Sequence, residues 1–184
     1  MKPTLLNLLL PALVAPVLSA QVIEDDFNDG NDSGWERYAP LAALGAPATF
    51  SFPGGSGYRV QSPPSPNAAL AGPARVGAHR ATTVYEAFRV EVDLIDWNNG
   101  LEQDIGVLGS LGEVGLGTTN GYAFSYDTGG EGLFISVLSG EQPDTLGSAS
   151  VTLIPGESYR MVFQGFFDVE EFYGQLCGEI FSLD

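Results

Sequence analysis

Residues 88–94 read FRVEVDL, so the apolar Phe88, Val90, Val92 and Leu94 alternate with three charged residues. Successive side chains of a β-strand point to opposite faces, whereas a helix repeats its apolar positions every three or four residues. The alternation therefore predicts an antiparallel strand with one face on the core and the other, carrying Glu91 and Asp93, in solvent.

The same period of two recurs on both sides of this segment. Turn signals such as Asn120-Gly121, Ser139-Gly140 and Pro155-Gly156 separate the apolar runs. The prediction is that Ser62–Pro73, which is rich in proline, forms an ordered surface loop. Further strands are predicted at Val22–Phe27, Ala48–Phe52, Tyr58–Gln61, Tyr122–Tyr126, Leu133–Val137, Val151–Leu153, Tyr159–Phe163 and Leu176–Ile180.

Short strands at regular spacing predict an all-β fold, a two-sheet antiparallel β-sandwich of jelly-roll type, with a closed barrel as the second choice. The 24 glycines among 184 residues argue against a helical protein, because glycine destabilises helix interiors. One domain over residues 21–184 accommodates all of these strands.

The charge excludes two classes of partner. The chain has 7 Lys plus Arg and 23 Asp plus Glu, which gives a net charge of -16. Nucleic acid and anionic membrane surfaces are therefore not expected as partners, since both need a basic patch.

Residues 1–20 have the layout of a secretory signal peptide, with Lys2, a leucine-rich stretch and Ala20 before Gln21. An uncleaved N-terminal anchor is the alternative. Nothing later in the chain predicts a transmembrane segment. The expected location is therefore secreted or at the cell surface, and the single cysteine, Cys177, excludes an intrachain disulfide.

An acidic cluster between Glu24 and Asp32 offers hard oxygen ligands around Gly30. Such ligands suit Ca²⁺, so one hypothesis is a calcium site. The alternative is an acidic turn whose Asp and Asn side chains cap the local backbone. The candidate metal ligands are Asp25, Asp26, Asn28, Asp29 and Asp32.

Glu91, Asp93 and Asp96 resemble the E-x-D-x-x-E strand motif of laminarinase-type glucanases. The resemblance implies that Glu91 is a nucleophile, Asp93 its assistant and Asp96 the acid/base. Residues 91 and 96 of a regular strand face opposite sides, so a shared cleft requires a bulge. The preferred interpretation is a solvated strand face without catalysis.

The aromatic residues Trp35, Trp97 and Tyr122 are candidate sugar-binding residues, because each can offer a flat apolar face with a polar edge. Packing in the core is the alternative role. His79 is the only histidine, which excludes a zinc site built on several histidines and leaves a Ser-His-Asp triad resting on one residue that looks exposed.

Several segments together resemble secreted bacterial domains of the concanavalin A-like lectin/glucanase (laminin G-like) superfamily, of the kind found in PEP-CTERM proteins. The segments are Glu24–Gly30 with Gly34-Trp35, Phe50–Gly55, Gly72–Arg75, Val92–Trp97, Gly115–Tyr122 and Pro155–Phe163. The resemblance implies the sandwich, and since such domains continue to one more strand, an open edge beside Val22–Phe27 is expected. It implies no single function, because the superfamily hosts lectins, hydrolases and adhesion modules.

The sequence thus predicts a secreted, non-catalytic domain that binds a polysaccharide or cell-surface glycan, or serves as an extracellular recognition module, with Ca²⁺ as a structural cofactor. A glucanase-like hydrolase using Glu91 and Asp96 is one alternative. A purely structural surface domain is the other.

Overall fold

The computed structural model describes residues 22–80, 87–98, 100–168 and 173–183. These residues form an all-β protein, as predicted. The only α-helix among them is the single turn α1 (Ala68–Ala71), which lies in the proline-rich loop, and two 3-10 turns occur at Ala42–Leu44 and Pro53–Gly55. The strands are β1 (Glu36–Tyr38), β2 (Thr49–Ser51), β3 (Arg59–Gln61), β4 (Gly77–His79), β5 (Ala87–Leu94), β6 (Asp104–Gly109), β7 (Gly121–Asp127), β8 (Gly132–Ser139), β9 (Gln142–Ser150), β10 (Tyr159–Asp168) and β11 (Tyr173–Ser182).

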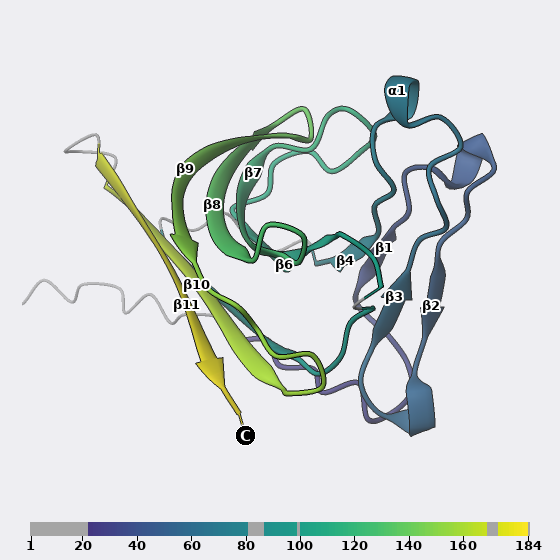
Figure 1. Ribbon diagram of the computed structural model, residues 1–184, viewed down its shortest axis with the longest axis horizontal. Coiled ribbons are helices and arrows are strands. Elements are labelled where there is room, and N and C mark those ends of the chain that lie inside the picture. The colour runs from purple at the N-terminus through teal and green to yellow at the C-terminus, as the bar shows by residue number, and fades with distance from the viewer. Residues whose placement is uncertain (1–21, 81–86, 99, 169–172, 184) are drawn as a thin grey trace, which may run out of the picture.

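Two antiparallel sheets make the sandwich (Figure 1). One is a meander of four sequential strands in the order β6-β7-β8-β9, and the other has the order β11-β10-β5. The pairs β1-β4 and β2-β3 lie to one side of these sheets, on the right in Figure 1. The described strands form open sheets and not a closed barrel, and a jelly-roll path of the chain stays a prediction.

The core lies between the two larger sheets. Phe124 of β7 and Phe163 of β10 are buried with ring centroids 6.0 Å apart, and Phe88 of β5 meets Phe163 edge-on at 5.1 Å. Met161 is fully buried beside them. Because these residues come from both sheets, their burial is what holds the sandwich together.

Glycine lets large rings fit between the sheets. A Cβ on Gly178 of β11 would lie 2.4 Å from the ring of Phe124, and a Cβ on Gly109 of β6 would lie 2.2 Å from the ring of Phe88. No side chain fits at such distances. Part of the high glycine content is therefore explained by aromatic rings that pack directly on backbone.

The faces of β5 follow the predicted alternation. Phe88 and Val90 pack against the core, Leu94 is buried, and Glu91 and Asp93 are exposed. Val92 is an exception on the inner face, with 41% of its surface exposed. The sequence pattern therefore predicted the orientation of this strand correctly.

Two predicted strands are wrong. Residues 22–27 form no strand, because Asp25 bonds the backbone N–H of Phe27, which adopts a left-handed φ of 53°. Side-chain bonds of this kind replace the ladder that a strand would need. Residues 151–153 also lie outside any strand, since β9 ends at Ser150 and the backbone N–H of Leu153 instead donates to the hydroxyl of Tyr126.

Four strands were not predicted: β1, β4, β6 and β9. β9 is exposed along its whole length, so it shows no apolar alternation. β1 and β4 have three residues each, too few to show a period. In β6 glycines occupy two of six positions.

β11 is the edge of its sheet within the described part of the chain, paired with β10 alone. The expected open edge beside Val22–Phe27 is not found there, because those residues form no strand. The predicted signal peptide, residues 1–20, lies outside the described residues. Among those described, no helix has the length and apolar character needed to cross a membrane.

Candidate functional site

The acidic loop, residues 24–33, is built from consecutive Asx turns. Asp25, Asp26, Asp29 and Asn31 each accept a hydrogen bond from the backbone N–H two residues ahead, at 2.8 to 3.1 Å. Short polar side chains favour this local bonding over a strand. The cluster in the sequence is therefore a chain of turns that the loop's own side chains stabilise.

The carboxylate oxygens of Asp25, Asp26 and Asp29 already accept hydrogen bonds. Both oxygens of Asp26 accept from Asn28, and both oxygens of Asp29 accept from Asn31. Asp25 accepts from the N–H of Phe27 and from the indole Nε1 of Trp35 at 2.8 Å. Within the part of the chain that the structure describes, no three His, Cys, Asp or Glu side chains are grouped as a metal site. The hydrogen bonds to Asp25, Asp26 and Asp29 favour the Asx-turn interpretation.

Under this loop lies an aromatic cluster, which we define as Phe27, Trp35, Phe50, Phe52 and Tyr58. The ring of Tyr58 stacks on Phe27 with centroids 4.8 Å apart and on Phe52 at 5.1 Å, and Trp35 lies 5.8 Å from Phe27. All five rings are only half-buried. The acidic loop and the β2–β3 hairpin thus present aromatic surface to solvent.

Asp32 joins the loop to this cluster. It accepts two bonds from Arg37, at 2.6 and 3.1 Å, and one from the hydroxyl of Tyr58 at 2.6 Å. The donors Arg37 and Tyr58 lower the pKa of Asp32 to about 2, while burial and the bond to Asp32 raise the pKa of Tyr58 to about 12. The guanidinium of Arg37 also lies over the ring of Phe50, 4.9 Å from its centroid. At neutral pH this corner is a fixed charged and aromatic surface.

The residues of the glucanase-like motif lie elsewhere, on the outer face of the β11-β10-β5 sheet and just beyond it. Asp93 stands opposite Arg160 in the register and accepts two bonds from it, at 2.6 and 2.8 Å. This pairing lowers the pKa of Asp93. Glu91 accepts from Arg89 at 2.6 Å, and Asp96 follows the end of β5. Both strand carboxylates are thus engaged in ion pairs with arginine.

The three candidate sugar-binding aromatics belong to separate packing groups. Trp35 is in the aromatic cluster, whereas Trp97 packs against the core beside Tyr159, with ring centroids 6.3 Å apart. Tyr122 lies on β7 and also packs against the core. Of the three, Trp35 is the one that contacts the acidic loop, because its indole N–H donates to Asp25.

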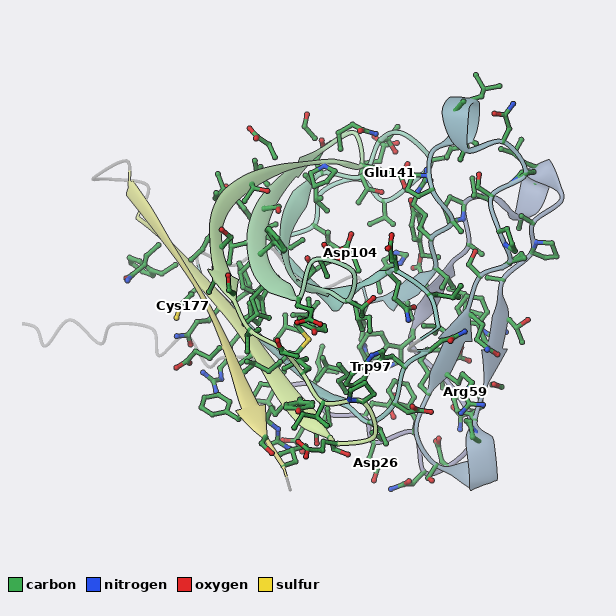
Figure 2. All side chains as sticks on the ribbon, viewed as in Figure 1. Asp26, Arg59, Trp97, Asp104, Glu141 and Cys177 are labelled. Atoms are coloured by element: carbon green, nitrogen blue, oxygen red, sulfur yellow. The ribbon has the colours of Figure 1, made fainter. Side chains whose placement is uncertain are left out.

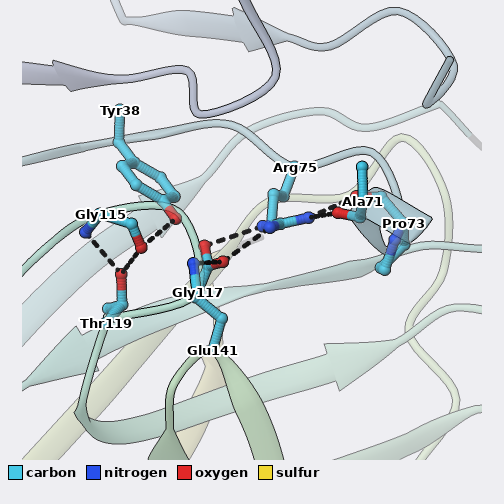
Figure 3. Close-up of polar contacts among 8 residues, drawn as sticks. All are labelled: Tyr38, Ala71, Pro73, Arg75, Gly115, Gly117, Thr119 and Glu141. Atoms are coloured by element: carbon cyan, nitrogen blue, oxygen red, sulfur yellow. Dashed lines mark hydrogen bonds and ion pairs between the residues drawn. The ribbon is translucent and has the colours of Figure 1, made fainter. Parts of the chain in front are cut away.

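A second polar centre, which the sequence did not indicate, is the ion pair of Arg75 and Glu141 (Figure 3). Arg75 donates to both carboxylate oxygens of Glu141, at 2.8 and 2.6 Å, and to the carbonyls of Ala71 and Pro73 at 2.9 Å. The N–H of Gly117 also donates to Glu141 at 2.6 Å. Burial raises the pKa of Glu141 and lowers that of Arg75.

This ion pair lines two neighbouring cavities, of about 570 and about 200 Å³. The larger is a groove rimmed by the exposed leucines Leu44, Leu70 and Leu116. The smaller is lined in part by His79, which is not exposed as expected: it lies in β4 opposite Glu36, with 19% of its side chain exposed. The partners of this centre come from loops distant in sequence, so no local motif could have revealed it.

Figure 2 places Asp26 and Glu141 at opposite ends of the view, so the acidic loop and the Arg75–Glu141 centre are separate surfaces. Of the two, the acidic loop is the one that combines several partly exposed aromatic rings with polar groups. No family model, curated protein or solved structure matches this chain.

Proposed function

We propose that this chain is a secreted or cell-surface, non-catalytic recognition domain that binds a polysaccharide or cell-surface glycan on the aromatic cluster and acidic loop. The observation that carries the proposal is the partly exposed aromatic cluster, which includes Trp35 and is bordered by the hydrogen-bonded carboxylates of Asp25 and Asp32. Sugar rings stack their apolar faces on aromatic rings, and polar groups at the border select their hydroxyls.

The ion pairs around Glu91 and Asp93 support a non-catalytic function. A glycosidase needs one carboxylic acid of raised pKa to protonate the leaving group and a second carboxylate facing it across the scissile bond. Arg160 instead lowers the pKa of Asp93. The hydrolase using Glu91, Asp93 and Asp96 is kept as the second outcome of the test below.

A glycan array followed by fluorescence titration tests the proposal. The chain has two tryptophans, Trp35 and Trp97, so each emission signal can be assigned. We expect a glycan from the array to change the tryptophan emission of the wild type and of Trp97→Phe equally. The same glycan should leave the emission of Trp35→Phe unchanged, and on the array it should bind that variant at least tenfold more weakly.

Binding that survives in Trp35→Phe would contradict the assignment of this surface. An array with no binder would favour the purely structural alternative. Release of reducing sugar from a β-glucan, abolished by Glu91→Gln, would establish the hydrolase.

Structural Ca²⁺ at Asp25, Asp26, Asn28, Asp29 and Asp32 stays a prediction of the sequence. If Ca²⁺ binds the folded loop, Ca²⁺ at one hundred times its dissociation constant stabilises the fold by about 2.7 kcal/mol. The expected result is a higher melting temperature with Ca²⁺ than with EDTA, lost in Asp29→Asn. Identical melting curves would show that the loop relies on its Asx turns alone.

A further inference from the structure

The edges of β9 and β11 lie on the side of the sandwich away from the β1-β4 and β2-β3 pairs (Figure 1), and neither edge pairs with another of the described strands. An unpaired edge presents a row of backbone donors and acceptors to any other strand, and proteins protect such edges with proline and charge. β9 carries Pro143 and Asp144 near its start. β11 has ten residues, no proline and one charged side chain, Glu179.

We propose that β11 pairs antiparallel with β11 of a second copy of this chain, joining two β11-β10-β5 sheets into one continuous sheet. A two-fold axis perpendicular to the sheet is the symmetry that produces such a pair. It keeps the inner face of one copy continuous with the inner face of the other. Residues that stand opposite each other must therefore face the same side of the sheet.

The sequence of β11 selects one register. Its inner face holds Leu176, Gly178 and Ile180, which contact the core, so Gln175, Cys177 and Glu179 face outward. The two registers nearest the middle of the strand place either Cys177 or Gly178 on the axis.

With Cys177 on the axis, Glu179 stands opposite Gln175 of the partner subunit and Leu176 stands opposite Gly178 of the partner subunit. A carboxylate then meets an amide on the outer face of the sheet. With Gly178 on the axis, Leu176 would meet the partner's Ile180 and Glu179 would meet the partner's Cys177. The first register gives the better pairs, and Figure 2 shows Cys177 pointing away from the body of the sandwich.

Charge sets the conditions for this association. Each copy carries a net charge of -16, so two copies repel each other at low ionic strength. Salt screens this repulsion over about 10 Å at 0.1 M, and the edge itself contributes only Glu179. Dimerisation should therefore strengthen as salt rises.

Sedimentation velocity of the full chain under reducing conditions, up to about 0.5 mM protein, tests the pairing. We expect a monomer–dimer equilibrium that shifts toward dimer between 0.05 and about 0.5 M NaCl. Gln175 is exposed, so its substitution leaves the fold unchanged, which circular dichroism checks.

Gln175→Lys places a positive charge opposite the partner's Glu179 and should tighten the dimer about fivefold, whereas Gln175→Glu should loosen it by about the same factor. A monomer at every concentration, or a dimer that neither variant changes, would overturn the proposal.

Cys177 reports the register directly. Directly opposed residues of an antiparallel pair have Cα atoms about 4.5 or 5.5 Å apart, within the range of a disulfide. Oxidised glutathione can accept the electrons: two Cys177 thiols lose two electrons and two protons, and one glutathione disulfide becomes two thiols. We expect a Cys177–Cys177 dimer that forms faster in Gln175→Lys than in Gln175→Glu.

A Cys177→Ser, Ser148→Cys double variant is the matched control, since it moves the only thiol to the exposed and protected β9 edge. It should give mixed disulfides with glutathione and no faster dimer formation than random collision. Equal rates of covalent dimer formation at the two edges would refute the β11 pairing.

Discussion

Asp104 shows how a single carboxylate can weaken this fold. It stands directly opposite Asp127 at the end of the β6–β7 ladder. Partial burial raises the pKa of Asp104, and the negative charge of Asp127 raises it further. Like charges directly opposite each other on neighbouring strands destabilise a sheet. Asp32 is the opposite case, since Arg37 and Tyr58 stabilise its charged form.

Asp104→Asn should therefore stabilise the protein at pH 7, by less than about 1 kcal/mol. A raised carboxyl pKa in the folded state means that stability is lost as pH rises through that pKa, because the folded state penalises the charged form. The gain from Asn should thus be present at pH 7 and vanish near pH 3. Urea denaturation of both proteins at the two pH values measures it.

Asp144→Asn is the control, because Asp144 faces Val137 across the ladder and not a carboxylate. An equal gain in both variants would mean that the net charge of the molecule, and not the facing pair, is responsible.

At the scale of the strands, glycine decides how closely the two sheets approach. Gly178 and Gly109 accept the rings of Phe124 and Phe88, and Gly165 of β10 also lies against Phe88. The two sheets are therefore held by rings that rest on backbone, and the order of large and small residues along each strand must match across the core.

Gly178→Ala should destabilise the fold by about 1 to 3 kcal/mol, because its new methyl group would clash with the buried Phe124 ring, 2.4 Å away. Gly147→Ala in β9 should cost almost nothing, since no atom lies within 4 Å of the added Cβ. Melting temperatures of the two variants give the comparison. If both variants melt like the wild type, the sheets can separate more readily than this packing implies.

At the scale of the whole molecule, the excess of acidic residues governs which ligands can approach. The net charge of -16 produces a negative potential that repels anions at low salt. The proposed binding surface adds to it through Asp25, Asp26 and Asp29, whose carboxylates accept hydrogen bonds from Phe27, Trp35, Asn28 and Asn31.

A neutral glycan should therefore bind with an affinity that changes less than about twofold between 0.02 and about 0.5 M NaCl. Acidic polysaccharides such as alginate should bind only at the higher salt concentration, if at all. Affinity gel electrophoresis with neutral and acidic polysaccharides at both salt concentrations measures this. Retention by alginate that weakens as salt rises would show a basic binding surface and contradict the assignment.

The sequence by itself determined the all-β class and the core-facing residues of β5, β7, β10 and β11, because alternation with a period of two follows from the pleat of a strand. It also predicted the Asx turns of the acidic loop as one of two interpretations, since those bonds span two residues. Strand alternation and Asx turns depend on residues close together in the sequence, so a local pattern can predict them.

Only the tertiary structure decided the rest. Strand β9 is exposed on both faces and has no apolar pattern, yet it pairs with β8 through its backbone. Arg75 donates to Glu141, which is 66 residues away in the sequence, and Tyr58 donates to Asp32, which is 26 residues away. Such contacts depend on where the chain returns after each turn. That return is set by the packing of Phe124, Phe163 and their neighbours between the sheets, and no local pattern records it.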